Sequence, residues 1–201
     1  MIVVLTSQEM READAEGTAA VGIDALMQRA GALIAAYVRE HVAPGSRIVA
    51  FAGPGNNGGD ARVACAQLAE YECVVYGPDE MPRDAGAARD ALEGAALAID
   101  ALFGTGARLP LPEQYLPAIR ALDARERRVL SIDIPSGVDA TTGAVPGDAV
   151  RASATLVLAA MKAGLLFDPA RARCGELWLA DIGIDGATLE AHAHSFAALD
   201  D

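Results

Sequence analysis

Short, wholly apolar segments alternate with helical patterns along this chain, and that alternation constrains the fold more than any other feature. Strands are predicted at residues 48–52, 73–76, 96–101, 129–134, 155–159 and 176–180. Helices are predicted at residues 24–41, 61–70, 83–93 and 113–125, and Thr6 or Ser7 can cap another. Strands that are apolar on both faces need cover on both sides. The pattern therefore predicts an α/β fold, a Rossmann-like, doubly wound and mostly parallel sheet in a three-layer sandwich.

Composition limits the kind of protein. The 201 residues fit one domain over residues 1–201, with a disordered or helical tail at 187–201. A net charge of −12 argues against nucleic acid or an anionic membrane as a partner. No segment reaches the roughly 18 apolar residues of a membrane span. The opening residues lack the basic flank of a signal peptide, and the three cysteines have no metal-ligand spacing, so we expect a cytoplasmic protein.

The first predicted strand–helix connection reads GPGNNGGD over residues 53–60. Glycines let the backbone turn sharply and approach a ligand closely, and free N–H groups at the following helix N-terminus attract anions. The asparagines and Asp60 add side-chain groups that a dinucleotide loop based on the backbone alone would not need. Asp60 could instead be a plain N-terminal helix carboxylate. The complete run favours a ligand site over a helix start.

Asp133 lies at the end of a very apolar strand, where an unpaired carboxylate is costly to desolvate. Between Ile132 and Ile134 its pKa can be raised, which suits a general acid or base. The turn that follows is expected to expose Ser136, yet its sequence is not that of a hydrolase nucleophile. Lys162, after the strand at 155–159, could lean toward the same site.

Three oxygen-bearing side chains, Asn57, Asp100 and Ser136, lie at adjacent strand ends. Oxygen-only ligands suit an alkali or alkaline-earth cation. A hydrogen-bond network that joins the loops is the alternative. The run from Asp100 to Gly106 opens a second glycine turn, and Arg108 beyond it is available to a phosphate, although a plain connecting loop would look the same.

Together GPGNNGGD, DALFGTG and DIPSGVD, with Lys162 and flanking segments, resemble the YjeF N-terminal family, the NAD(P)HX epimerases, over nearly the whole chain. The resemblance implies a Rossmann-like enzyme that interconverts the (6R)- and (6S)-hydrates of NADH and NADPH, with Asp133 as acid/base at C6 and one potassium ion on Asn57, Asp100 and Ser136. It also implies that the substrate is held by Asp133 and two loops: Asn56, Asn57, Gly58, Gly59 and Asp60; and Gly104, Thr105, Gly106, Ala107, Arg108, Leu109 and Pro110.

The same resemblance implies a homodimer, for which the helix around residues 25–38 could supply the interface, and a functional link to an ADP- or ATP-dependent NAD(P)HX dehydratase. The chain departs from the family at Ala61, where glycine is usual and a Cβ could approach the ligand. A non-catalytic nucleotide-binding or scaffold module of the same fold is the alternative function. The retained acids at the strand ends favour the enzyme.

Overall fold

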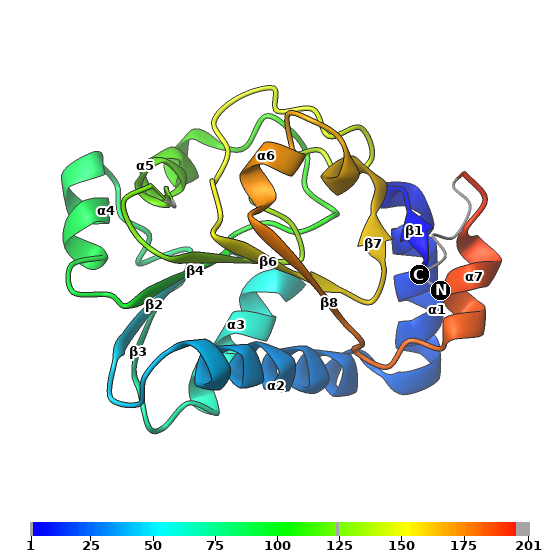
Figure 1. The fold of residues 1–201 in the computed structure, drawn as a ribbon, viewed down its shortest axis with the longest axis horizontal. Helices are drawn as coiled ribbons and strands as arrows, with labels where there is room; N and C mark the ends of the chain where they lie inside the picture. The colour runs from blue at the N-terminus through cyan, green and yellow to red at the C-terminus, as the bar shows by residue number, and fades with distance from the viewer. Residues whose placement is uncertain (1, 124, 196–201) are drawn as a thin grey trace.

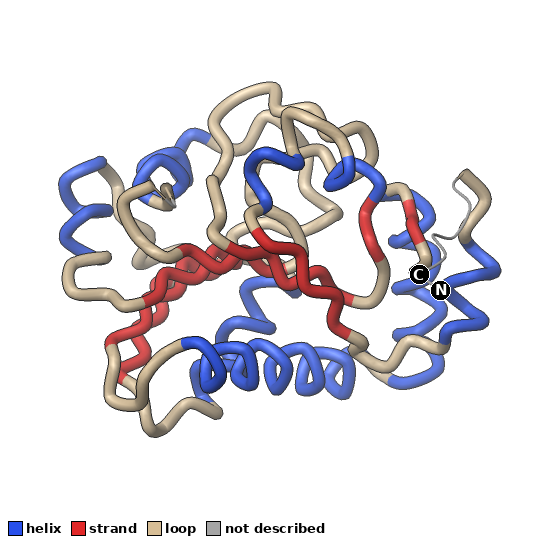
Figure 2. Tube along the Cα trace, viewed as in Figure 1, coloured by secondary structure: helices blue, strands red, loops and turns tan. Residues whose placement is uncertain are grey.

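A six-stranded parallel sheet forms the centre of the protein in the computed structural model, which describes residues 2–123 and 125–195. The strand order is β3-β2-β4-β5-β6-β8, and every neighbouring pair is parallel. Figure 2 shows the strands in red at the centre of the molecule. The strands are β2 (Arg47–Ala52), β3 (Glu72–Tyr76), β4 (Leu97–Ala101), β5 (Val129–Ile132), β6 (Ala154–Leu158) and β8 (Glu176–Ala180). The predicted doubly wound sheet is confirmed.

Helices cover both faces of this sheet, as the three-layer prediction requires (Figure 1). The long α2 (Ile23–His41) and α3 (Asn56–Ala66) lie on one face, and α4 (Ala85–Ala91) and α5 (Leu116–Ala121) lie on the other. Each face has its own apolar core. Side chains of α2 and β2 contribute to the first, and those of α4 and α5 contribute to the second.

Beyond one end of the sheet, α1 (Ser7–Val21) packs against α7 (Gly186–His192) (Figure 1). Thr6 caps α1 as predicted, in a capping box with Glu9. A pair of short strands that the sequence pattern did not predict, β1 (Val4–Leu5) and β7 (Met161–Lys162), joins this end to the sheet. The remaining helical turns are the 3₁₀ segments η1 (Glu113–Tyr115) and η2 (Ala163–Leu166), and α6 (Arg171–Cys174).

Some predicted boundaries were wrong. The helix placed at 61–70 begins at Asn56, so Gly58 and Gly59 are helical and Asp60 lies in the second turn, not the first. A Cβ on Gly58 would come 2.1 Å from the Gly53 carbonyl oxygen, so the glycine allows close packing here and not a turn. The helix placed at 113–125 ends as α5 at Ala121.

The fold places the connections after β2 and β4 at one edge. Strand β2 lies between β3 and β4, so the chain leaves β2 toward the α3 face, and after β3 it crosses to the α4 face. In open α/β sheets, ligands bind at the carboxyl ends of the strands beside such a reversal of strand order. GPGNNGGD follows β2, and the DALFGTG run spans the end of β4 and the loop after it.

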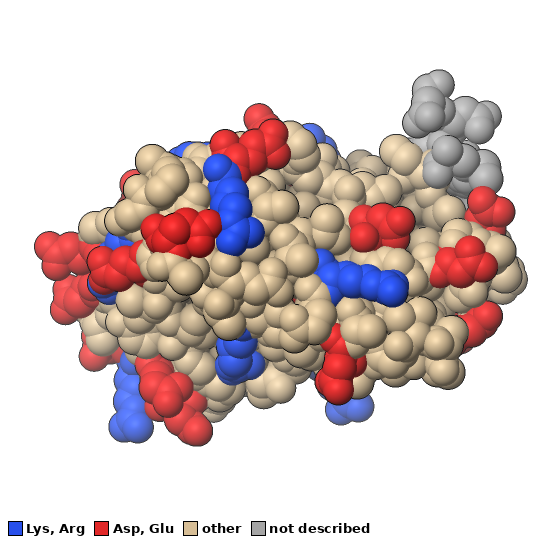
Figure 3. Space-filling view, turned by 90° about the horizontal axis from the view of Figure 1, so that it is seen from below, with Lys and Arg blue, Asp and Glu red and all other residues tan. Residues whose placement is uncertain are grey.

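The surface of the protein can be compared with the predicted homodimer and the other predicted partners. The apolar face of α2 is buried within the chain at Leu26, Ala30, Ile34 and Val38, so these side chains are not available to a dimer interface. On the face drawn in Figure 3, acidic and basic side chains are interspersed on a largely uncharged surface.

Within the described ranges no single helix is long and apolar enough to cross a membrane; α1 and α2 meet that test only as a pair bent by 107°. Of the predicted tail, residues 196–201 lie outside the described residues.

Candidate active site

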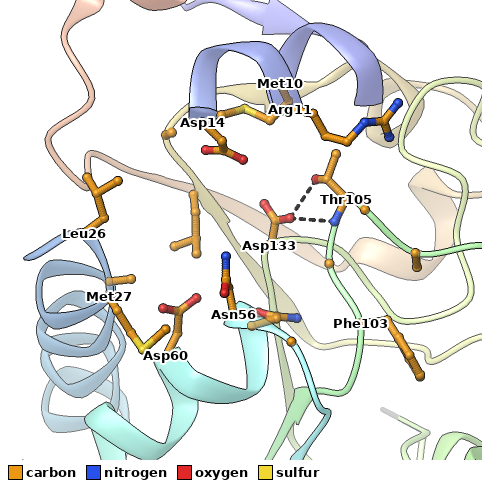
Figure 4. Close-up of a pocket in the computed structure, with 18 of the residues that line it drawn as sticks. Met10, Arg11, Asp14, Leu26, Met27, Asn56, Asp60, Phe103, Thr105 and Asp133 are labelled. Atoms are coloured by element: carbon orange, nitrogen blue, oxygen red, sulfur yellow. Dashed lines mark hydrogen bonds between the residues drawn. The ribbon is translucent and has the colours of Figure 1, made fainter. Parts of the chain in front are cut away.

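A cavity of about 660 Å³ opens at the carboxyl ends of β2, β4 and β5, and α1 and α2 close it on the other side (Figure 4). Its lining is mostly apolar, which suits a drug-sized organic ligand held by a few polar groups. Of the predicted substrate residues, those that line it are Asn56, Asn57, Asp60, Gly104, Thr105, Gly106, Ala107, Arg108 and Asp133.

At the base of the cavity, Asp133 forms a buried ion pair with Lys162. The Lys162 Nζ lies 2.5 Å from Asp133 Oδ1 and donates to the Leu158 carbonyl oxygen at 2.5 Å. Lys162 is the only lysine in the sequence and its residue surface is 1 % exposed. The prediction that it leans toward the site is confirmed.

The other oxygen of Asp133 is bound by the loop after β4. Thr105 donates to Oδ2 from its hydroxyl at 2.7 Å and from its backbone N–H at 3.0 Å. A Cβ on Gly104 would come 3.0 Å from the same oxygen, so glycine allows the loop to approach the carboxylate. Both carboxylate oxygens therefore face positive charge or hydrogen-bond donors.

The pKa of Asp133 shifts in the direction opposite to the prediction. Burial acts to raise it, but the Lys162 ammonium and the Thr105 hydrogen bonds outweigh burial and hold the pKa of this carboxyl below its usual range. The flanking isoleucines indicated the burial correctly, whereas the lysine partner comes from about thirty residues further along the chain.

Backbone conformation also marks this position. In the part of the chain that the structure describes, the non-glycine residues with positive φ are Asp133, at 69°, and Ala159, at 62°, and both line the cavity. Such conformations cost roughly 1–3 kcal/mol each and cluster at functional sites. Because φ becomes positive at Asp133, β5 ends at Ile132, earlier than predicted.

On the α3 wall, Asp60 points into the cavity from a different side (Figure 4). It is 6 % exposed, and no described residue hydrogen-bonds or ion-pairs with its carboxyl. Burial raises its pKa to about 8, with further contributions from the charges of Asp133 and Asp14. Asp60 therefore keeps its proton at neutral pH, unlike Asp133.

Asp14 reaches the same cavity from α1 (Figure 4). Asp14 is exposed, and it lines the cavity. Desolvation raises its pKa to about 6, the Lys162 ammonium lowers it in part, and the Asp133 charge raises it further. Asp14 was not predicted as a site residue. Its i, i+4 spacing with Met10 and Thr18, which also line the cavity, is the signal that could have placed it here.

Asp100 and Ser136 lie beneath the cavity floor and do not line it. Both are fully buried, so the prediction that the turn exposes Ser136 was wrong. The Ser136 hydroxyl donates to Asp100 Oδ1 at 2.6 Å, and the Ser136 N–H and the Ser131 hydroxyl donate to Oδ2, each at 2.8 Å. These hydrogen bonds join the turn after β5 to the end of β4. A loop-joining hydrogen-bond network is therefore present.

Asn57 stands between the network and the cavity. Its Nδ2 donates to the Ile132 carbonyl oxygen at 3.1 Å, while its Oδ1 is buried and has no hydrogen-bond partner among the described residues. A buried, unpaired amide oxygen is costly, and so it indicates a missing donor or cation.

The remaining predicted positions lie outside the lining. Gly58 and Gly59 pack behind it, Gly58 against Gly53 and Gly59 against Met27. Leu109 and Pro110 follow the lining part of their loop. Ala61 is fully buried in the core on the α2 face and does not line the cavity, so its Cβ does not approach a ligand there as we expected.

Comparison with known proteins gives three kinds of match. The family model described as YjeF-related protein N-terminus matches residues 23–93 and 77–164. An NAD(P)H-hydrate epimerase of Bordetella pertussis (strain CS) is 38% identical over 187 residues, 82% of this chain and 82% of that protein. A bifunctional NAD(P)H-hydrate repair enzyme Nnr of Thermosynechococcus vestitus is 32% identical over 93% of this chain but 41% of its own length. The crystal structure of the yeast protein ynu0 shares the fold, with a TM-score of 0.79 at 20% identity over 98% of this chain and 96% of that one.

Proposed function

The chain belongs to the YjeF-related N-terminal family, and from this membership and the site we propose that it is an NAD(P)H-hydrate epimerase, an isomerase that interconverts the (6R)- and (6S)-hydrates of NADH and NADPH. The observation that carries the proposal is the Asp133–Lys162 ion pair, which faces a largely apolar cavity between two glycine-rich loops. Relatives that bear the epimerase name span nearly the same length as this chain.

The reaction explains why a carboxylate is held there. In the hydrate, C6 carries a hydroxyl group and the ring nitrogen, so the hydroxyl can leave as water while the nitrogen lone pair forms an iminium. An anion beside the ring stabilises that developing positive charge, and it can accept the proton of the water that returns. Asp133, ionised and fixed by Lys162 and Thr105, fits both tasks.

The rest of the dinucleotide needs groups that accept phosphate. The backbone N–H groups at the start of α3, around Gly55 and Asn56, point toward the cavity end of the helix. Arg108, at the exposed rim of the opposite loop, can pair with a phosphate. We therefore place the nicotinamide end at Asp133 and the pyrophosphate between these two loops.

The family resemblance also implies potassium, and the donor set fits a monovalent cation. Asn57 offers a buried oxygen that no described residue satisfies, and Asp100 is a wholly buried carboxylate whose hydrogen-bond donors are uncharged. Burial raises the pKa of Asp100 despite those hydrogen bonds. We propose that Asn57, Asp100 and Ser136 hold the ion, which would supply positive charge beneath the cavity floor.

Two partners and a cellular location follow as proposals. We propose that the epimerase works beside an NAD(P)HX dehydratase, and relatives named as bifunctional NAD(P)H-hydrate repair enzymes support this proposal. We also propose a homodimer and a cytoplasmic location. Sedimentation at micromolar concentration tests the dimer, which a single 20.7 kDa species would contradict.

The deciding experiment follows the epimer ratio of purified NADHX over time by chromatography, with and without the protein. The hydrate epimerises slowly by itself, so acceleration over the blank is the measured quantity. We expect strong acceleration in potassium buffer and less when potassium is replaced by a bulky organic cation. Nucleotide binding without acceleration would favour the scaffold alternative.

A further inference from the structure

The proposed epimerisation, on which this inference rests, needs two proton states at once. The departing hydroxyl at C6 must receive a proton, and the returning water must lose one. If water leaves one face of the ring and returns to the other, a protonated group and an ionised group must serve the two faces. The cavity contains carboxyl groups on different walls, so this requirement can be tested against their surroundings.

In the resting site Asp133 is held in its ionised state. Lys162 forms an ion pair with Oδ1 and Thr105 donates to Oδ2, so a proton on either oxygen would disturb one of these interactions. Protonating Asp133 would also leave the buried Lys162 ammonium without its counter-charge. The proton donor must therefore be sought elsewhere in the lining.

Asp60 has the opposite surroundings. Its residue surface is 6 % exposed, it opens on the cavity, and no donor or cation among the described residues contacts its carboxyl. An ionised carboxylate in that setting would be unpaired and poorly solvated, which disfavours the charge. Helix α3 holds Asp60 on a rigid wall, and α2 packs so closely behind it that a Cβ on Gly59 would meet Met27.

We propose that Asp60 is the proton donor of the epimerisation and that it works across the cavity from the ionised Asp133. As the C6–O bond breaks, the N1 lone pair forms the N1=C6 bond and the Asp60 proton passes to the departing oxygen, giving water. Water then forms a new bond to C6 on the other face, the electron pair returns to N1, and Asp133 accepts the released proton. The reverse reaction exchanges the two roles, and cavity water equilibrates the proton between turnovers.

Charge around the donor decides how firmly it keeps its proton. The ionisable groups that line the same cavity are Arg11, Asp14, Asp60, Arg108, Asp133 and Lys162. Burial raises the pKa of Asp60 to about 8, with the charges of Asp133 and Asp14 adding to the effect. Lys162 is already paired with Asp133 and donates to the Leu158 carbonyl oxygen, so it offers Asp60 little compensation. Asp14 is thus a residue that tunes the donor without replacing it.

The first test compares Asp60→Asn with Asp90→Asn, an exposed aspartate on α4 that lies outside the cavity lining. Both epimers of NADHX are assayed in saturating potassium against a blank. We expect Asp60→Asn to lose about 100-fold or more of the acceleration and Asp90→Asn to keep it, since general acid catalysis contributes roughly 10²–10⁴-fold. An Asp60→Asn enzyme within threefold of the wild type overturns the proposal. A wild-type protein without acceleration contradicts the proposed function instead.

The second test follows the protonation state of Asp60 through the pH dependence of kcat/KM. The wild-type kcat/KM should fall above about pH 8, as Asp60 loses its proton. Asp14→Asn removes a nearby negative charge, so this alkaline fall should move to lower pH by about one unit. Asp60→Glu should restore part of the activity that Asp60→Asn loses. An alkaline fall that stays in place in Asp14→Asn overturns the assignment, because a purely structural role for Asp60 predicts no such shift.

Discussion

Two walls of one cavity give aspartate side chains opposite surroundings. On the strand-end wall, formed by Asp133, Lys162 and Thr105, the carboxylate has a cation and two hydrogen-bond donors. On the helix wall, formed by Asp14 of α1 and Asp60 of α3, no described residue pairs with either carboxyl. The pKa of Asp133 is therefore lowered, and that of Asp60 is raised to about 8.

The difference teaches that burial alone does not set a proton state. Burial is the largest influence on both groups and acts to raise both pKa values, so the partners decide the outcome. Titratable groups whose surroundings push their pKa values apart are how one site holds an acid and a base together. Each of the following substitutions changes one wall of the cavity and leaves the other intact.

The largest effect is expected from Asp133→Asn. Epimerase acceleration should fall about 1,000-fold, because the neutral amide neither stabilises the iminium nor accepts the proton. Stability should also fall, by roughly 2–4 kcal/mol, since the buried Lys162 ammonium loses its counter-charge. Chromatographic assay and urea unfolding measure the two changes. Acceleration equal to that of Asp90→Asn would remove Asp133 from the mechanism.

The pair itself is tested by removing each partner and then both. Lys162→Met should cost about 3–5 kcal/mol near pH 8, because it leaves an unpaired buried carboxylate. The pKa of Asp133 would then lie above its unfolded value, so the stability of this variant should fall as pH rises through the unfolded pKa and up to the new folded one. The double variant Asp133→Asn/Lys162→Met should be more stable than Lys162→Met. Additive losses would show that the two side chains are not coupled.

Much of the strand-end wall could be predicted from the sequence. The apolar strand before Asp133 and the glycines after β4 are local patterns, and both placed their residues at the correct edge of the sheet. The pairing with Lys162 depends on β6 lying beside β5 and on β7, which follows β6 in the chain, so the sequence only suggested it. The predicted direction of the Asp133 pKa shift was wrong for that reason, because the local sequence indicates burial but not a partner that is distant in the sequence.

The helix wall was harder to predict. Asp60 was identified within GPGNNGGD, but its proton state depends on α2 covering α3 and on charges from β5 and α1. Asp14 lies on an amphipathic helix whose exposed and cavity-facing polar residues look alike in the sequence. The start of α3 at Asn56 was missed because two adjacent glycines normally argue against a helix, whereas here they allow it to pack against Gly53 and Met27.

A smaller effect, opposite in sign, is expected on the helix wall. Asp60→Asn should raise the free energy of unfolding by roughly 2–4 kcal/mol at pH 8. The folded pKa of about 8 exceeds the unfolded value near 3.8, so the wild type loses stability as pH rises from about 4 to 8 and no more beyond that. The variant lacks this decline. Urea unfolding at pH 5 and pH 8 should therefore give a larger gain at pH 8; equal gains would mean that Asp60 does not hold its proton.

The smallest effect is expected from Thr105→Val, which keeps the shape of the side chain and removes only the hydroxyl donor to Asp133 Oδ2. A hydrogen bond to a charged group contributes about 1.5–3 kcal/mol, but the Thr105 N–H and Lys162 remain, so a rate loss near tenfold is expected. The pKa of Asp133 should rise slightly, moving the acidic limb of kcat/KM to higher pH while the alkaline limb stays fixed. If the alkaline limb moved instead, the two walls would not titrate separately, and the assignment of one proton state to each would fail.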